Sequence, residues 1–523
     1  MNNTFSVGSS SPDFQVIVIG AGPGGIAAGV FLKKSNIDFC VLERANAVGG
    51  SWRDNDYPDI GVDVPFFLYQ YSFARKADWA RLFPKGDEVR QYHVDVAVNQ
   101  GLMPHIRFNT EVVKEVWNEE HHYWHLHLAN GETLTARFVI KAVGAFIQPK
   151  SDDGLKGLEN YKGKIQKPTE WDHHYELTGK RVAVIGTGAS SVQISPAIAS
   201  MVESLDVYQR TPVYCFPKVD IKNNFLFRNL LRIPGFVALL NGILLVVIEI
   251  VLRLILTTPL TFAKRILHRF DRIGKRRYGL LVKRAVKDQE VAQALIPAYS
   301  IAVKRPTISN KFLQIFNRDN TSLVTTPIDT FTKKGIKTQD GVEHEYDMVV
   351  VATGYKMFSD PESYPRGTVI GRHGVDLGAF FMEHKLQAYD SVSIPNFPNR
   401  WMLIGPYSWT GTGWHFMVET SARHAVRVIK EVLKRKASFA DISREAHDAY
   451  HNKLKKRERA LKYYFTELNA GVNTYFVNSQ GDVPYIRPTT AFEALWNSYR
   501  LPLTDYQYET VENTNQPECC FGC

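Results

Sequence analysis

Two glycine-rich turns carry residues whose types and spacing suit the binding of dinucleotides. The turns read Gly20-Ala21-Gly22-Pro23-Gly24-Gly25 and Gly186-Thr187-Gly188-Ala189-Ser190-Ser191. In such a turn the first glycine permits the tight bend, and the second lets a pyrophosphate approach bare backbone. The phosphates then bind free N–H groups at the start of the following helix. Two such turns predict two bound dinucleotides and electron transfer between them.

Each turn lies between a predicted strand and a predicted helix, which is the context that the motif requires. The apolar runs Val16-Ile17-Val18-Ile19 and Val182-Ala183-Val184-Ile185 precede the turns, and small residues follow them. A single match to the glycine pattern is weak evidence. Two matches in the right context predict two nucleotide-binding units.

The residue that ends the second strand of each unit distinguishes the two dinucleotides, because it lies roughly 20 positions past the turn and contacts the adenosine ribose. In the first unit Glu43 follows the apolar run 39–42, and its carboxylate can accept both ribose hydroxyls. At the matching offset the second unit has Gln209 followed by Arg210, whose guanidinium pairs with a 2′-phosphate. Arg210 taken alone fits a solvated surface charge equally well, and the matched offset favours phosphate. We therefore predict FAD in the first unit and NADPH in the second.

Composition sets broad limits on the class of protein. The 523 residues predict two or three domains. The chain has only five cysteines among 523 residues, which favours a reducing compartment without structural disulfides. Residues 2–10 are polar and lack the apolar core of a secretory signal, so we expect a cytoplasmic protein. The terminal Cys519, Cys520 and Cys523 fit prenylation poorly, which leaves reversible acylation or a polar end that holds thiols.

The net charge and the histidines predict neither a nucleic-acid partner nor a metal site. The net charge is +10, but no nucleic-acid-binding module accompanies it, so we predict no nucleic-acid partner. His125 and His127 fall on one face of a predicted strand, yet no third ligand with suitable spacing is evident. A solvated polar face explains them better, and we predict no metal site. The sequence holds no signal for the oligomeric state.

The two turns predict an α/β fold with two Rossmann-like dinucleotide-binding domains, the second inserted in the first. We place the discontinuous FAD domain at 1–160 and 340–523, with a hairpin-like stretch at 112–140. The NADPH domain occupies 161–339 and carries a helical apolar insertion at about 220–300. The buried run 348–351 ends at Gly354, and we expect it to rejoin the FAD domain and close over the flavin.

Four stretches resemble one family, the class B flavoprotein monooxygenases, and within it the Baeyer-Villiger monooxygenases. They are 49–63, which runs from Gly49-Gly50-Ser51-Trp52 through Tyr57-Pro58 to Asp63; 161–172; Lys304-Arg305-Pro306 with 316–320; and Ala352-Thr353-Gly354 with Gly405-Pro406. Four positions depart from the family pattern: Asp59 replaces glycine or methionine, Tyr161 replaces a phenylalanine, Lys167 replaces a histidine, and Tyr407 stands where many members have asparagine. The likeness covers nearly the whole chain outside the termini and about 220–300.

The resemblance implies roles for individual residues. Arg305 is expected to be the active-site cation, Asp63 to orient it, and Lys304 to bind the 2′-phosphate beside Arg210. Lys167 takes the place of the histidine in the linker, so it either weakens the coupling of domain movement or keeps a hydrogen-bond donor. The expected catalytic residues are thus Arg305, Asp63 and Lys167. The expected cofactor-binding residues are Gly20, Gly22, Gly25, Glu43, Gly50, Trp52, Asp63, Gly186, Gly188, Ser191, Arg210, Thr211, Lys304, Thr353 and Gly354.

The resemblance also implies a reaction. NADPH reduces FAD, and reduced flavin reacts with molecular oxygen to a C4a-peroxyflavin, which needs a shielded pocket and a fixed positive charge. Arg305 supplies that charge because guanidinium stays protonated. The oxidant then inserts one oxygen atom beside the carbonyl of a small apolar ketone, which gives an ester or lactone.

Other interpretations stay open at this point. A disulfide reductase is nearly excluded, because Ser51 and Trp52 stand where its cysteine pair belongs. An N- or S-oxygenating flavin monooxygenase shares the scaffold but needs no active-site arginine. A non-catalytic flavin-bound scaffold is the third alternative. Arg305 and Asp63 are also consistent with a buried ion pair between domains.

A long apolar stretch at 236–256 has about the length that spans a bilayer. Asn241, Glu249 and Arg253 interrupt it and fall within about one third of the helix circumference. Basic residues follow at Lys264, Arg265, Arg269, Arg272, Lys275, Arg276, Arg277, Lys283 and Arg284. Peripheral membrane contact through 236–284 and a roof over the substrate pocket are the two interpretations.

Overall fold

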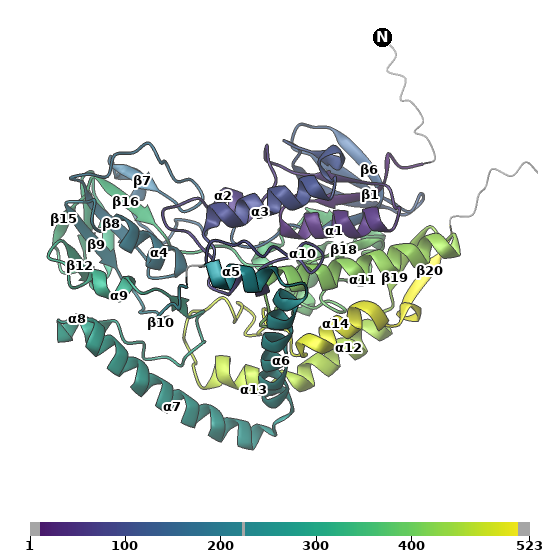
Figure 1. Cartoon of the computed structure of the whole chain (residues 1–523). Coiled ribbons are helices and arrows are strands. Elements are labelled where there is room, and N and C mark those ends of the chain that lie inside the picture. The colour runs from purple at the N-terminus through teal and green to yellow at the C-terminus, as the bar shows by residue number, and fades with distance from the viewer. Residues whose placement is uncertain (1–10, 222–224, 511–523) are drawn as a thin grey trace, which may run out of the picture.

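Two sheets, each built around one glycine-rich turn, organise the chain in the computed structural model, which describes residues 11–221 and 225–510 (Figure 1). The first has strand order β17-β4-β5-β6-β1-β2-β3, with β18 also paired to β6. Its strands are β1 (Phe14–Ile19), β2 (Phe39–Leu42), β3 (Ile106–Arg107), β4 (Val112–Asn118), β5 (Tyr123–Leu128), β6 (Thr133–Lys141), β17 (Val369–Ile370) and β18 (Arg400–Met402). The second has order β12-β9-β8-β16-β7. Its strands are β7 (Lys164–Gln166), β8 (Arg181–Ile185), β9 (Ser204–Tyr208), β12 (Thr321–Val324) and β16 (Met348–Val351).

The first sheet combines the nucleotide-binding strands with an antiparallel meander. β1 pairs in parallel with β2 and β6, so its glycine turn leaves the sheet near the centre. β4, β5 and β6 pair antiparallel, which confirms the hairpin-like stretch predicted at 112–140. β17 and β18 join this sheet although they follow the second sheet in sequence. The second unit is therefore inserted in the first, as predicted.

The strand at 348–351 is a correction, because it does not rejoin the first sheet. β16 pairs in parallel with β8 on one side and with β7 on the other, so it belongs to the second sheet. All four of its residues are buried. An apolar run buried on both faces suits an interior parallel strand, and the second sheet offers it two neighbours. The predicted boundary at 339/340 moves past β16, and the boundary at 160/161 stays a prediction.

Helices cover both sheets and connect their strands. Those outside the insertion are α1 (Pro23–Lys34), α2 (Ser51–Asp54), α3 (Gly86–Asn99), α4 (Ala189–Ile198), α9 (Phe312–Ile315), α10 (Leu377–His384), α11 (Trp414–Arg435), α12 (Arg444–Arg457), α13 (Arg459–Lys462) and α14 (Ala491–Arg500). α1 packs against α11, whose inward face is buried over most of its length. α4 begins directly after the second glycine turn and contacts β8.

The predicted helical insertion is confirmed. It consists of α5 (Phe225–Arg232), α6 (Phe236–Thr257), α7 (Leu260–Ala285) and α8 (Gln289–Ala294). In Figure 1, α7 runs along the lower edge of the molecule and α6 stands beside α14. α6 packs against α13, α14 and the short helix η1 (Phe66–Leu68).

Smaller pieces complete the structure. β13 (Ile328–Phe331), β14 (Gly335–Thr338) and β15 (Glu343–Glu345) form an antiparallel sheet, β10 (Cys215–Phe216) pairs with β11 (Thr307–Ile308), and β19 (Phe439–Ile442) pairs with β20 (Tyr506–Glu509). The polar segment 2–10 and the terminal Cys519, Cys520 and Cys523, which entered the predictions on location and acylation, lie outside the described residues.

Candidate active site

The first glycine turn has the geometry of a dinucleotide-binding loop. Gly20 has φ of 103°, a backbone conformation that favours glycine. A Cβ at Gly25 would lie 1.8 Å from the Gly20 carbonyl oxygen, so only glycine fits there. α1 then begins with Pro23 in its first turn, has no side-chain cap at Gly22, and has no acidic residue in that turn. Its N-terminal N–H groups are therefore available to an anion such as pyrophosphate.

A second bare stretch of backbone faces this turn. A Cβ at Gly50 would come within 2.9 Å of the Gly22 Cα atom, and one at Gly22 within 3.3 Å of the Gly50 Cα atom. Gly50 has φ of 56°, in the left-handed region. Two glycines that meet without side chains form a backbone cradle, and this observation fits the binding of FAD phosphates beside α1.

Glu43 lies where the sequence predicts a ribose-binding carboxylate. It follows β2, is buried, and its Oε2 atom accepts a hydrogen bond of 2.7 Å from the Ala21 amide. Its Oε1 atom accepts from the Ala45 amide at 3.0 Å and from Arg53 Nη1 at 3.1 Å. The carboxylate thus connects the end of β2 to the glycine turn. Arg53 is a partner that sequence reasoning missed, although it is adjacent to Trp52 in the family-like stretch.

The second glycine turn repeats the first with one added contact. Gly186 has φ of 110°, and a Cβ there would lie 2.6 Å from the Ala352 carbonyl oxygen. Because β16 neighbours β8, the Thr353-Gly354 turn lies beside this loop, in the second unit. The Thr187 hydroxyl donates to the Thr211 carbonyl at 2.8 Å. Ser191 is buried within α4, where its hydroxyl lies 3.4 Å from that of Ser195.

A substitution at Gly188 tests cofactor binding without disturbing the fold. It precedes α4 without a side-chain cap, and a Cβ there meets no atom of the protein within 4 Å. We expect Gly188→Ala to fold normally and keep FAD, but to raise the KM for NADPH on the order of tenfold, because the added methyl occupies the path of the pyrophosphate. Steady-state kinetics and thermal unfolding measure this. Gly154→Ala, also in open space, is the control, and an unchanged KM in Gly188→Ala would refute the assignment.

Three cations from distant segments converge near the second turn. Burial lowers the pKa of Lys304, and the positive charges of Arg210 and Lys150 lower it further. A bound anion reduces the repulsion between such like charges, which fits the 2′-phosphate predicted beside Arg210 and Lys304. Sequence reasoning missed Lys150. No local motif marks it, and its amide reaches the cluster by donating to the Gly354 carbonyl at 3.0 Å.

The predicted catalytic pair is formed across the two units. Arg305 Nη2 donates to Asp63 Oδ1 at 2.7 Å. Burial alone lowers the pKa of Arg305, but the Asp63 carboxylate and nearby tyrosine hydroxyls outweigh it and raise that pKa above its usual value. The tyrosines are Tyr475, Tyr485 and Tyr69. The Arg305 side chain is 40% exposed, so the ion pair is not sealed from solvent. The guanidinium holds a permanent positive charge.

Contacts between the units hold Asp63 in place. Gln193 on α4 donates to the Gly61 carbonyl at 3.0 Å and accepts from the Tyr57 hydroxyl at 3.0 Å. The loop that carries Asp63 is thereby tied to the helix that follows the second glycine turn. Trp52, on the same loop region, donates from its indole N–H to the Tyr69 hydroxyl at 2.8 Å. The arrangement places the Arg305 guanidinium at the contact between the two units.

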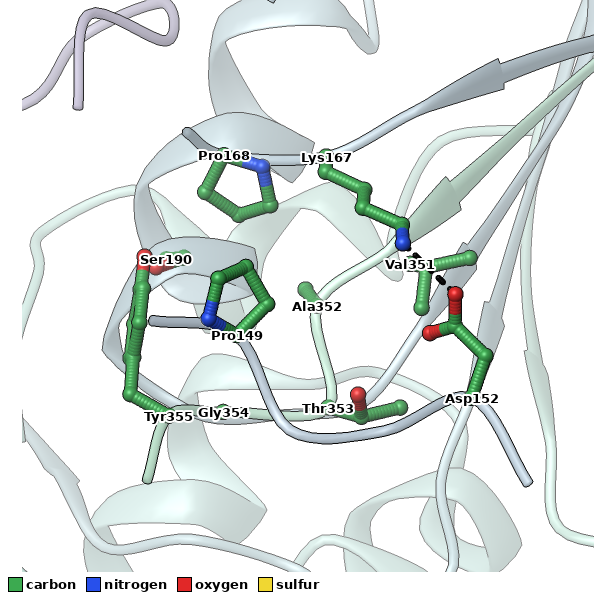
Figure 2. A pocket seen from close by; sticks show the side chains of 10 residues that line it. All are labelled: Pro149, Asp152, Lys167, Pro168, Ser190, Val351, Ala352, Thr353, Gly354 and Tyr355. Carbon is green, nitrogen blue, oxygen red and sulfur yellow. Dashed lines mark hydrogen bonds and ion pairs between the residues drawn. The ribbon is translucent and has the colours of Figure 1, made fainter. Parts of the chain in front are cut away.

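Lys167 lies apart from Arg305, in a small pocket shown in Figure 2. Its Nζ atom pairs with Asp152 Oδ2 at 2.6 Å. Thr353, Gly354 and Tyr355 line the same pocket. The structure thus brings Lys167 together with two predicted cofactor-binding residues, and it does not bring Lys167 to the catalytic pair.

Two departures from the family pattern lie at left-handed backbone. Asp59 has φ of 64°, a conformation that glycine adopts freely and aspartate tolerates. Its carboxylate pairs with Lys85. Tyr407 has φ of 60° and is fully buried, and its hydroxyl accepts from Lys455 Nζ at 2.8 Å. The asparagine typical of the family suits this conformation better than tyrosine, so the Lys455 contact offsets local strain.

The two histidines of β5 have ordinary polar partners. His125 Nε2 lies 3.4 Å from the Asn118 amide nitrogen, and His127 Nδ1 lies 3.0 Å from the Thr133 hydroxyl. Within residues 11–221 and 225–510, no group of three or more histidine, cysteine, aspartate or glutamate side chains is placed to hold a metal ion.

Comparison with known proteins agrees with this geometry. A family model described as pyridine nucleotide-disulphide oxidoreductase matches residues 17–224. The chain is 32% identical over 500 residues to a Baeyer-Villiger monooxygenase of Streptomyces coelicolor, covering 94% of this chain and 92% of the relative. It is 33% identical over 456 residues to a Baeyer-Villiger monooxygenase of Pseudomonas aeruginosa, covering 85% and 82%.

A solved structure described as OTEMO in complex with FAD and NADP matches with a TM-score of 0.82 at 23% identity, covering 95% of this chain and all of that one. This likeness extends the agreement to the arrangement of both sheets. Since the two bacterial relatives share the pattern along most of their own length, and the motifs that resemble the family lie around both glycine turns, this chain belongs to the Baeyer-Villiger monooxygenases.

Proposed function

We propose that the chain inserts one atom of molecular oxygen beside the carbonyl of a small apolar ketone, which gives an ester or lactone, with FAD and NADPH as cofactors. The observation that carries the proposal is the Arg305–Asp63 pair of 2.7 Å at the contact between the two dinucleotide units. A heteroatom-oxygenating enzyme on the same scaffold needs no such arginine. The family membership supports the same reaction.

The residues assigned to each cofactor fit it chemically. The Gly22–Gly50 cradle and the uncapped start of α1 suit the FAD pyrophosphate, and Glu43 suits its ribose hydroxyls. The uncapped start of α4 suits the NADPH pyrophosphate. When bound, FAD supplies the redox chemistry that activates oxygen, with electrons from NADPH.

The protein's own contribution is electrostatic. Arg305 remains protonated at any working pH, so it stabilises negative charge next to the substrate without giving up a proton. Asp63 accepts one N–H of the guanidinium and fixes its orientation, which leaves the other N–H donors free to face the reacting atoms. Nearby Tyr69, Tyr475 and Tyr485 are largely buried and limit the access of water.

A side-by-side assay tests the proposed function. The purified holoenzyme is given NADPH, oxygen, and either an apolar ketone or a thioether, and ester, sulfoxide and peroxide are each measured against NADPH consumption. We expect ester or lactone from the ketone. Sulfoxide without ester would favour heteroatom oxygenation, and an absence of NADPH oxidation with FAD bound would indicate a non-catalytic scaffold.

Lys167 is proposed to support the coupling of NADPH oxidation to product formation. Its ion pair with Asp152 connects the linker to the pocket that Thr353 and Gly354 line. Lys167→Met removes this ion pair. We expect the product formed per NADPH to fall about two- to fivefold, with peroxide making up the difference, as the loss of a partly exposed ion pair that contributes about 1 kcal/mol would give. Lys167→His is expected to restore coupling.

The matched control is Lys164→Met. Lys164 begins β7, which ends one residue before Lys167, and it pairs with Asp172 at the same distance of 2.6 Å and with similar exposure. Equal coupling losses in the two variants would assign Lys167 a structural role only.

A further inference from the structure

The helix α6 presents its polar side to the protein and its apolar side to the outside. Asn241 donates a hydrogen bond to the Phe67 carbonyl. Glu249 is buried, and its Oε2 atom accepts from the Phe492 amide at 3.0 Å. Of the most apolar window of this helix, only 6% is buried. This is the reverse of a helix that packs on a soluble core.

The outward face of α6 is a continuous apolar strip. Its exposed residues are Leu239, Ile243, Val246, Val247, Ile250, Val251 and Leu254, with exposed fractions from 44% to 61%. At about 100° per residue they fall within roughly 140° of the helix circumference. Surface apolar residues scattered singly need no explanation, whereas a patch of this extent marks a binding surface.

The next helix, α7, continues the pattern and adds charge. Its exposed apolar residues are Phe262, Ile266, Phe270, Ile273 and Leu280, which fall within about 80° of its circumference. Directly beside them, within about 60°, lie the exposed cations Arg265, Arg269, Arg272, Arg276 and Lys283. An apolar stripe flanked by arginines is the composition of a helix that lies in a membrane interface.

The C-terminal helix α14 extends the same surface. Phe492, Trp496 and Tyr499 are exposed there, Trp496 to 65%. Trp496 shares a groove with Arg253 and Leu256 of α6, so the aromatic rings lie next to the apolar strip. Tryptophan and tyrosine are enriched where a bilayer meets water. Sequence reasoning did not include α14, because 233 residues (258–490) lie between it and α6 and only folding brings the two helices together.

We propose that the exposed apolar residues of α6, α7 and α14, with the cations of α7, form a docking surface for an anionic lipid leaflet. Buried apolar area and attraction between arginines and anionic headgroups both contribute to binding at such a surface. α6 does not cross the bilayer, because its polar side is bonded to the protein at Asn241 and Glu249. A second copy of this chain is disfavoured as the occupant, since face-to-face contact would oppose the two arginine stripes.

Docking has a consequence for the substrate, and this step rests on the proposed function. α6 contacts η1, which lies three residues beyond Asp63, and Ile248 approaches the loop at Gly411. The leaflet would therefore cover the helix that packs on the catalytic loop. The substrate class that this favours is a lipophilic ketone that partitions into the membrane.

Flotation with vesicles tests the docking without any activity measurement. We expect the holoenzyme to float with phosphatidylcholine vesicles that contain phosphatidylglycerol, and weakly with phosphatidylcholine alone. Val247→Glu with Ile250→Glu is expected to abolish flotation. Arg269→Glu with Arg276→Glu is expected to weaken it about tenfold or more, since each basic residue near an anionic surface contributes on the order of 1 kcal/mol.

The control replaces exposed residues elsewhere, Val342→Glu with Lys334→Glu, and is expected to float normally. Flavin content and thermal unfolding confirm that every variant folds. Failure of the unaltered protein to float, or equal flotation of the Val247→Glu with Ile250→Glu variant, would overturn the proposal. The proposal would also be overturned if the unaltered protein formed an oligomer without lipid and the Val247→Glu with Ile250→Glu variant did not.

A separate readout distinguishes the substrate step from the docking. With a long-chain ketone in vesicles, the flotation-deficient variant is expected to lose turnover, while turnover of a short water-soluble ketone stays unchanged. Loss of both activities in a protein that still binds FAD would count against the proposed function and leave the flotation result standing.

Discussion

Arg305→Ala is expected to lower ester formation about 10²- to 10³-fold while NADPH oxidation continues. The reason is that a preorganised cation contributes roughly 3–4 kcal/mol to stabilising charge that develops in the transition state. Reduction of FAD does not depend on this charge, so the electrons end on oxygen as peroxide. Product and peroxide per NADPH, measured together in single-substrate assays, give the result.

Two further variants identify what the arginine does. Arg305→Lys keeps a charge without the planar fork that Asp63 orients, and it is expected to recover only part of the activity. Arg81→Ala removes an ion pair of similar exposure, Arg81–Asp220 at 2.9 Å, away from the site, and is expected to leave activity unchanged. Ester formation at the normal rate in Arg305→Ala would show that the charge of Arg305 has no role in the reaction.

The double variant Arg210→Ala with Lys304→Ala is expected to raise the KM for NADPH about 10²-fold and to leave the KM for NADH nearly unchanged. Each hydrogen bond to a charged phosphate contributes about 1.5–3 kcal/mol, and every 1.4 kcal/mol is tenfold in affinity. The ratio of kcat/KM for the two nucleotides is the measurement.

NADH serves as the internal control, because it lacks the 2′-phosphate. Lys150→Ala is expected to give a smaller change in the same direction, which would place the third cation at the phosphate. An equal rise in the KM for both nucleotides would show that the two residues shape the site as a whole and do not read the phosphate.

Several features follow from local sequence alone. Apolar strands that end in glycine turns predict both nucleotide loops, because the φ values of Gly20 and Gly186 and the close approach at Gly25 depend on residues within a few positions. Glu43 directly follows β2, and Arg210 lies two residues beyond the end of β9, so both follow a strand as the sequence pattern predicts. The resemblance to the family adds the Arg305–Asp63 pair, which no spacing rule connects across 242 positions.

Other features depend on which segments meet in space. The run 348–351 is apolar enough for either sheet, and only pairing with β7 and β8 decides that it joins the second. Lys150 reaches the cluster at Lys304 through a loop that carries no motif.

The sequence by itself determined the two glycine-rich loops and the existence of a polar stripe on α6, since these rest on contacts between near neighbours and on helical periodicity. Tertiary structure alone decided that Asn241 and Glu249 turn toward the protein, so that the apolar face of α6 points outward. Periodicity shows that a helix has two faces. Which face is covered depends on distant partners such as Phe67 and Phe492, which only the folded chain brings together.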